Sequence, residues 1–113
     1  MFYDTANTGL IPLKMCSATV EFDQFTPDWT LAQVNTSEEQ RTFVCNVLFD
    51  APFSNVPIVH VGLSGFDMDQ RHSARISVRA DTITSSGFEL NIKTWRDTRV
   101  YKLEVSWIAL GQA

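Results

Sequence analysis

The stretch that decides the fold is residues 94–110, which read Thr94-Trp95-Arg96-Asp97-Thr98-Arg99-Val100-Tyr101-Lys102-Leu103-Glu104-Val105-Ser106-Trp107-Ile108-Ala109-Leu110. After a polar turn at its start, apolar and polar residues alternate. The first set is Tyr101, Leu103, Val105 and Trp107, and the second is Lys102, Glu104 and Ser106. Alternation of period two is typical of a β-strand with one buried face. We therefore expect a strand over residues 100–110.

The same period recurs along the rest of the chain. The further expected strands are 18–23, 42–49, 58–66, 75–80 and 88–93. Turn-forming residues separate them, and only residues 36–40 are expected to form a single helical turn. The segment 42–49 is apolar on both faces, so we expect both faces to be covered. Six short strands at regular spacing predict an all-β, six-stranded antiparallel β-sandwich.

Length and charge narrow the classes of function. The chain has 113 residues, which fits one domain, and its net charge is −4. The acidic balance argues against nucleic acid and against an anionic membrane surface. No apolar run is long enough for a membrane helix, and the start of the chain does not resemble a signal peptide. We expect an irregular or extended arm over residues 1–16 and a sandwich domain over 17–113. Cys16 and Cys45 could form one bridge, but we favour two free thiols.

The sequence contains no convincing motif for catalysis or for metal binding. The stretch Gly62-Leu63-Ser64-Gly65 is not a nucleophile elbow, and the two histidines, His60 and His72, are isolated. The stretch Asp67-Met68-Asp69-Gln70 resembles the start of a calcium loop but lacks the remaining ligands. No pair of acids has a spacing that suggests glycoside hydrolysis. We expect no enzyme, no cofactor and no metal site.

The turn framed by Trp95 and Tyr101 is the better candidate for a binding site. Apolar sugar faces pack on aromatic rings, and sugar hydroxyls need charged or amide partners. Trp95 shares the outward face of its strand with Lys93, so it is either exposed or covered by a strand edge, a partner chain or a ligand. Tyr101 fits the core equally well, and Arg75 with Arg79 also fits a solvated face. The pattern alone therefore favours a binding sandwich only weakly.

Residues 36–111 resemble the H-type lectins. The markers, in order, are Phe49-x-x-Pro52-Phe53, Pro57-Ile58-Val59, Gly87-Phe88-x-Leu90, Thr94-Trp95, Thr98-x-Val100-Tyr101 and Ser106-Trp107-Ile108. The resemblance implies a six-stranded antiparallel sandwich. It also implies a homotrimer, with a dimer of trimers as a further level, and galactose or N-acetylgalactosamine bound at the clefts between protomers.

The resemblance also implies a set of site residues. The carbohydrate-binding positions carried over from the family are Thr36, Glu38, Arg75, Trp95, Arg96 and Tyr101. In the family an acid at position 38 accepts hydrogen bonds from galacto-configured hydroxyls, and an arginine at position 75 donates them. Three positions depart from the family pattern: Thr36 replaces glycine, Glu38 replaces aspartate, and the always-charged Arg96 replaces histidine. These departures change the size and charge of the pocket.

The sequence thus predicts a metal-independent lectin for galactose or N-acetylgalactosamine glycans, of the kind that acts in agglutination and cell adhesion. Such a protein is expected outside the cell or on a cell or virion surface. The alternative is a trimeric structural or receptor-binding module, such as a fibre tip or an appended domain, without a working sugar site.

Overall fold

A computed structural model describes residues 12–33 and 39–113. These residues form six strands and no helix. The strands are β1 (Leu13–Asp23), β2 (Gln40–Leu48), β3 (Ile58–Met68), β4 (Ile76–Asp81), β5 (Gly87–Trp95) and β6 (Val100–Gln112). Each contains or overlaps one strand expected from the alternation, so the prediction of an all-β antiparallel fold is confirmed.

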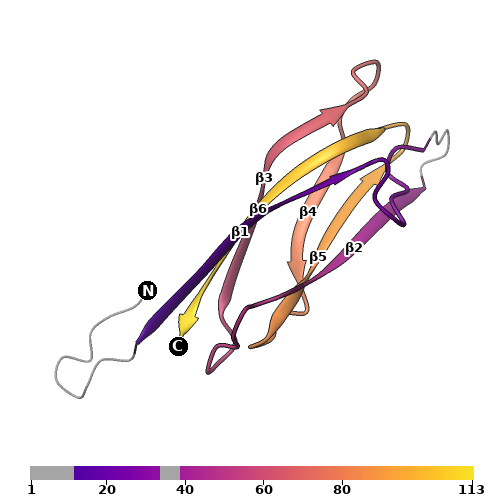
Figure 1. Cartoon of the computed structure of the whole chain (residues 1–113). Helices are drawn as coiled ribbons and strands as arrows, with labels where there is room; N and C mark the ends of the chain where they lie inside the picture. The colour runs from indigo at the N-terminus through magenta and orange to yellow at the C-terminus, as the bar shows by residue number, and fades with distance from the viewer. Residues whose placement is uncertain (1–11, 34–38) are drawn as a thin grey trace.

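Two three-stranded antiparallel sheets make up the sandwich, one in the order β1-β6-β3 and the other in the order β2-β5-β4. Figure 1 shows them as two layers, with β6 in the middle of one and β5 in the middle of the other. Because β5 and β6 follow each other in the chain, the turn between them crosses from one sheet to the other. This crossing lies at one end of the sandwich.

The core lies between the sheets and follows the alternation. The fully buried apolar strand residues are Leu90 and Ile92 of β5 and Val100, Leu103, Val105 and Ala109 of β6. Aromatic rings fill the two halves: Phe49, Phe88 and Trp107 pack together in one, and Phe22, Trp29 and Phe43 in the other. The second group lies nearer the β5–β6 crossing, because the indole of Trp29 donates a 2.9 Å hydrogen bond to the Val100 carbonyl.

Strand β2 does not bury both of its faces within a single chain. Phe43 is buried, but Val44 is 48% and Leu48 is 78% exposed on the opposite face. The expectation of cover on both faces is therefore not met by this chain alone. Strand β1 begins at Leu13, inside the stretch expected to form the arm, so the division at residue 16 stays a prediction. Residues 1–11 lie outside the described part.

Two further expectations concern the cysteines and the membrane. Cys16 and Cys45 are free thiols, as expected, and both are half-buried. Burial raises the pKa of the Cys45 thiol, which keeps it protonated and unreactive at neutral pH. Within residues 12–33 and 39–113 there is no helix of the length and apolarity that a membrane span requires.

Candidate functional site

The residues expected to bind sugar come from connections at one end of the sandwich. The β3–β4 loop (residues 69–75) ends at Arg75, and the β5–β6 turn (residues 96–99) follows Trp95. Figure 1 shows both connections at the end of the sandwich where β3 and β5 finish and where β4 and β6 begin. Residues far apart in the sequence therefore meet here.

Arg75 joins the loop to the turn. Its Nη1 donates a 2.9 Å hydrogen bond to Asp97 Oδ1 and a longer one of 3.4 Å to Thr98 Oγ1. Thr98 in turn donates to the Ser73 carbonyl at 2.7 Å, and the Thr94 hydroxyl donates to the Arg75 carbonyl. The Arg75 side chain remains 23% exposed. The guanidinium is therefore fixed in position and still open to a ligand.

Asp97 and His72 are two site residues that the sequence reasoning missed. His72 Nδ1 lies 3.1 Å from Asp97 Oδ2, so the carboxylate lies between the imidazole and the Arg75 guanidinium. Both side chains are partly exposed. Only their nearness in sequence to predicted site residues pointed to them: Asp97 directly follows the Trp95-Arg96 pair, and His72 lies three residues before Arg75. Neither signal shows that the two connections touch.

Trp95 and Arg96 end β5 and begin the turn. Trp95 is half-buried and pairs with Gln40 at the start of β2. Arg96 is exposed and has a φ of 59°, in the left-handed region. Residues other than glycine occupy this region at a cost of about 1 kcal/mol, so surrounding contacts must hold the turn in this shape. One such contact is the hydrogen bond from Arg41 Nη2 to the Arg96 carbonyl, at 2.7 Å.

Tyr101 faces the start of the β3–β4 loop. Its hydroxyl donates a 3.3 Å hydrogen bond to Asp69 Oδ2. Asp69 also accepts bonds from the backbone and side chain of Arg71, at 2.9 Å from both N and Nε. These bonds from Arg71 hold the pKa of Asp69 well below its usual range. Tyr101 is thus half-buried at the site end of β6 and touches the loop that also carries Arg75.

Thr36 and Glu38 lie outside the described residues, as does most of the expected helical turn over 36–40. The flanking residues are at the site end of the sandwich. The Gln33 carbonyl accepts a 2.9 Å hydrogen bond from Arg41, and Gln40 is the register partner of Trp95.

Metal ligands do not gather in the described part of the chain, where no three His, Cys, Asp or Glu side chains form a group that could hold an ion. The resemblance of residues 67–70 to a calcium loop does not extend to the structure. Asp67 pairs in register with Lys102, and Asp69 is bound to Arg71 and Tyr101.

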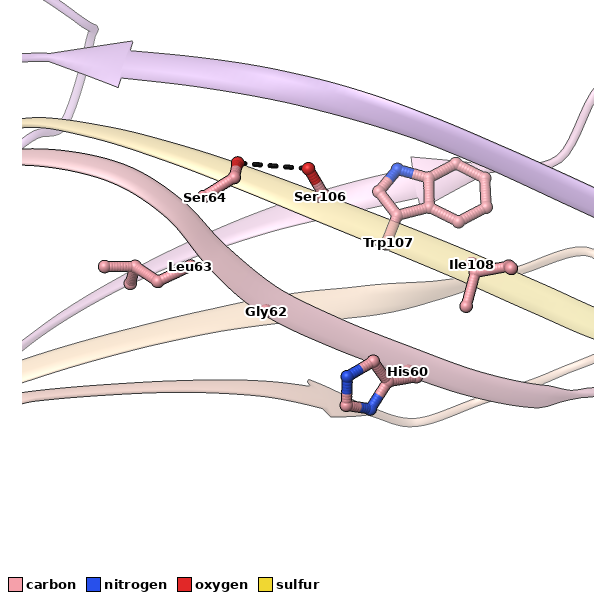
Figure 2. Close-up of a pocket in the computed structure, with 7 residues that line it drawn as sticks. All are labelled: His60, Gly62, Leu63, Ser64, Ser106, Trp107 and Ile108. Carbon is pink, nitrogen blue, oxygen red and sulfur yellow. Dashed lines mark hydrogen bonds between the residues drawn. The ribbon is translucent and has the colours of Figure 1, made fainter.

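A shallow hollow lies elsewhere, on the outward side of β3 and β6 (Figure 2). Its lining includes His60, Ser64, Ser106 and Ile108. The two serine hydroxyls are 3.0 Å apart and are joined by a hydrogen bond. None of the residues expected to bind sugar lines this hollow.

Comparison with known proteins places these residues in a family. A sequence model described as the H-type lectin domain matches residues 44–110. The chain is 39% identical over 79 residues to the protein named "ATP synthase subunits region ORF 7" of Fuscovulum blasticum, covering 70% of this chain and 69% of that protein. It is 30% identical over 99 residues to a discoidin-1 polypeptide of Dictyostelium discoideum, covering 87% of this chain and 38% of that protein.

Solved structures agree with the sequence comparison. Wild-type discoidin II of Dictyostelium discoideum matches with a TM-score of 0.72 and 25% identity, over 90% of this chain and 38% of that one. The tailspike of Pseudomonas phage phi297 matches with a TM-score of 0.51 and 16% identity, over 85% of this chain and 15% of that one, which shows a shared fold alone. The chain, which spans less than half of each discoidin, belongs to the H-type lectin family.

Proposed function

We propose that this chain is a metal-independent lectin domain that binds galactose- or N-acetylgalactosamine-type glycans through Thr36, Glu38, Arg75, Trp95, Arg96 and Tyr101. The observation that supports it best is the meeting of Arg75 with the turn that follows Trp95, at one open end of the sandwich. Membership of a lectin family supports sugar binding as the function of this end of the sandwich.

The described side chains suit a sugar. All the hydrogen bonds from Arg75 to described residues leave from Nη1, so Nε and Nη2 face no protein acceptor among them. A planar guanidinium can donate two bonds to neighbouring hydroxyls. Trp95 follows Thr94, the register partner of Ile76, and its ring would supply an apolar surface for the sugar face. A carboxylate at Glu38 would supply the acceptor that galacto-configured hydroxyls need.

The direct test is titration calorimetry with a monovalent galactoside and N-acetylgalactosamine. Binding of either sugar, with glucose as the epimeric control, supports the proposal. A chain that binds none of the three at millimolar concentration would leave only the structural-module alternative.

We also propose a homotrimer with the sugar sites at its protomer clefts. The outward face of the β1-β6-β3 sheet carries Met15, Ile58 and Ile108, of which Met15 is 64% and Ile58 is 65% exposed. Cross-strand register places Met15, Leu110 and Ile58 in one row, with Ile108 in the next row. An apolar patch of this kind on a small domain marks an interaction surface, and closed threefold symmetry would bury it.

The trimer gives a prediction with a matched control. Ile58→Lys should convert a trimer into monomers in light scattering, because it places three buried charges around one axis. Leu48→Lys, at a position 78% exposed on the other sheet, should leave the mass unchanged. A wild-type chain that is a stable monomer at micromolar concentration would refute the trimer, and dissociation by Leu48→Lys alone would move the interface to β2.

Metal independence gives a second prediction. Sugar binding should be the same in EDTA as in calcium, because no acidic cluster is found among the described residues and Asp69 is bound to Arg71 and Tyr101. The measurement is the galactoside affinity after dialysis against EDTA and after calcium is restored. Loss in EDTA and recovery with calcium would reopen the Asp67 and Asp69 stretch as an ion site.

The alternative function is a trimeric structural or receptor-binding module without a sugar site. The similarity to part of a phage tailspike favours it, since it shows this fold inside a much larger protein. Retention on immobilised galactose and release by free galactose would separate the two functions.

The family is one of lectins rather than enzymes. We propose that the chain acts outside the cell or on a cell or virion surface, where glycans are displayed.

A further inference from the structure

Arg41 is a buried arginine behind the proposed sugar site. It is the second residue of β2, is only 8% exposed, and pairs in register with Thr94 of β5. Buried arginines usually face a carboxylate. Here the guanidinium instead donates to four backbone carbonyls, those of Leu31, Gln33, Arg96 and Thr98.

The four carbonyls belong to two separate segments. Nη1 donates to the segment 31–33, at 3.3 Å to Leu31 and 2.9 Å to Gln33. Nη2 donates to the β5–β6 turn, at 2.7 Å to Arg96 and 2.8 Å to Thr98. The two nitrogens are held at a fixed separation by the planar group, so their bonds fix the distance between the segments.

The charge of Arg41 is retained despite its burial. Desolvation lowers its pKa, while the charges of Asp97 and Glu39 oppose that effect. Arginine stays protonated under such shifts, because its ordinary pKa lies far above neutral pH. The cation is therefore balanced by the charges of Asp97 and Glu39 and by the four carbonyls that accept its hydrogen bonds, and removing it would take one donor from each of these carbonyls.

Both segments that Arg41 holds adjoin residues of the proposed site. The turn carries Arg96 and directly follows Trp95, and residue 33 directly precedes the stretch that contains Thr36 and Glu38. A sugar that binds beside the turn depends on where Arg41 holds the turn relative to residues 31–33. Errors of about 1 Å are enough to weaken a binding site whose supporting contacts are loose.

We propose that Arg41 is a positioning residue that sets the spacing between residues 31–33 and the β5–β6 turn of the sugar site, without touching the sugar. This inference rests on the proposed function. The Leu31 carbonyl provides an independent readout of the same spacing, because it also accepts a 2.8 Å hydrogen bond from the Val100 amide. Loosening of the segment should therefore appear as faster hydrogen exchange at Val100.

The test compares Arg41→Lys, Arg41→Met and a control, Arg79→Met, whose side chain is 65% exposed on the outward face of β4. Lysine keeps the charge but lacks the fork that reaches two segments at once. We expect Arg41→Lys to fold, to bind galactoside about tenfold more weakly, and to exchange the Val100 amide faster. Arg79→Met should stay within about twofold of wild type. Methionine removes every donor, so Arg41→Met should be the least stable of the three.

The outcomes distinguish a failure of the positioning role of Arg41 from a failure of the proposed sugar binding. If Arg41→Lys melts at a lower temperature but binds galactoside with unchanged affinity while folded, Arg41 is only structural and the inference is overturned. If the wild-type chain itself binds no galactoside, the proposed function fails and the role of Arg41 in binding fails with it. Weaker binding with unchanged Val100 exchange would also overturn the inference, because it would indicate direct contact with the sugar instead of a change in spacing.

Discussion

Arg75→Ala should weaken galactoside binding by about ten- to a hundredfold while the chain remains folded. Loss of a charged hydrogen-bond partner costs roughly 1.5–3 kcal/mol, which corresponds to that range of affinity. The side chain is partly exposed and its bonds to protein use one nitrogen, so its removal opens no cavity in the core. Glu38→Ala should produce a loss of the same size, because it removes the proposed acceptor for sugar hydroxyls.

Monovalent calorimetry and agglutination should differ in how they report this loss. Several sites on one trimer multiply a change in each site, so either variant should appear inactive in agglutination. Trp95→Ala should weaken binding further, since it removes the stacking ring and loosens the start of the turn. Arg79→Ala is the matched control, because Arg79 is an arginine of β4, four residues after Arg75, whose side chain bonds only to Asp81 among the described residues.

A complication is that Arg75 also holds Asp97, so its loss could act by moving the turn. Asp97→Asn addresses this, because it keeps the size of the side chain and removes the charge that pairs with Arg75 and His72. If Arg75 contacts the sugar, Asp97→Asn should change affinity far less than Arg75→Ala. Wild-type affinity in both Arg75→Ala and Glu38→Ala would remove the site from this end of the sandwich.

The fold could be predicted from the sequence because alternation fixes which face of each strand is buried. In the long strand β6, Leu103, Val105 and Trp107 face the core as the pattern indicated, while Lys102 does not. A shift of one residue would exchange these two sets, so few registers were possible. The exposed Leu48 shows the limit of the same reasoning. A pattern can show that a face is apolar, but it cannot show whether the same chain covers it.

The site could be predicted only in part, because its contacts cross between connections. Trp95 was identified from the aromatic residues that frame the turn, and the role of Arg75 came from a family resemblance. The contacts of Asp97 with Arg75 and His72 depend instead on how the loop and the turn meet. One feature of the sequence could have indicated that Arg41 is buried. It lies two residues before Phe43 and so occupies the inward face of its strand, where a charge is unusual. An inward arginine needs acceptors, and only the structure shows that four carbonyls supply them.

The second large effect is expected from Gly87→Ala, which should lower the free energy of unfolding by about 3 kcal/mol, near the upper end for overpacking. Gly87 begins β5 and pairs with Leu48 at the end of β2. A β-carbon at this position would lie 2.1 Å from the Val47 carbonyl oxygen, a backbone atom. The glycine cannot easily move away, because its amide and carbonyl are both bonded to Thr84. The close approach of the β2 backbone at Val47 explains why a glycine stands at position 87, the first residue of the Gly87-Phe88-x-Leu90 marker.

Urea unfolding of Gly87→Ala and Gly62→Ala at equal protein concentration checks this explanation. At Gly62, also within a strand, the nearest atom to an added β-carbon is His60 Nε2 at 3.9 Å, an ordinary contact. Alanine there should be neutral or stabilise the chain by up to about 1 kcal/mol, because it restricts the unfolded state. A change in midpoint without a change in slope would show that stability, not the compactness of either state, had altered. If Gly87→Ala were as stable as Gly62→Ala, the pairing of β2 with β5 at Leu48 could not be as close as the structure has it.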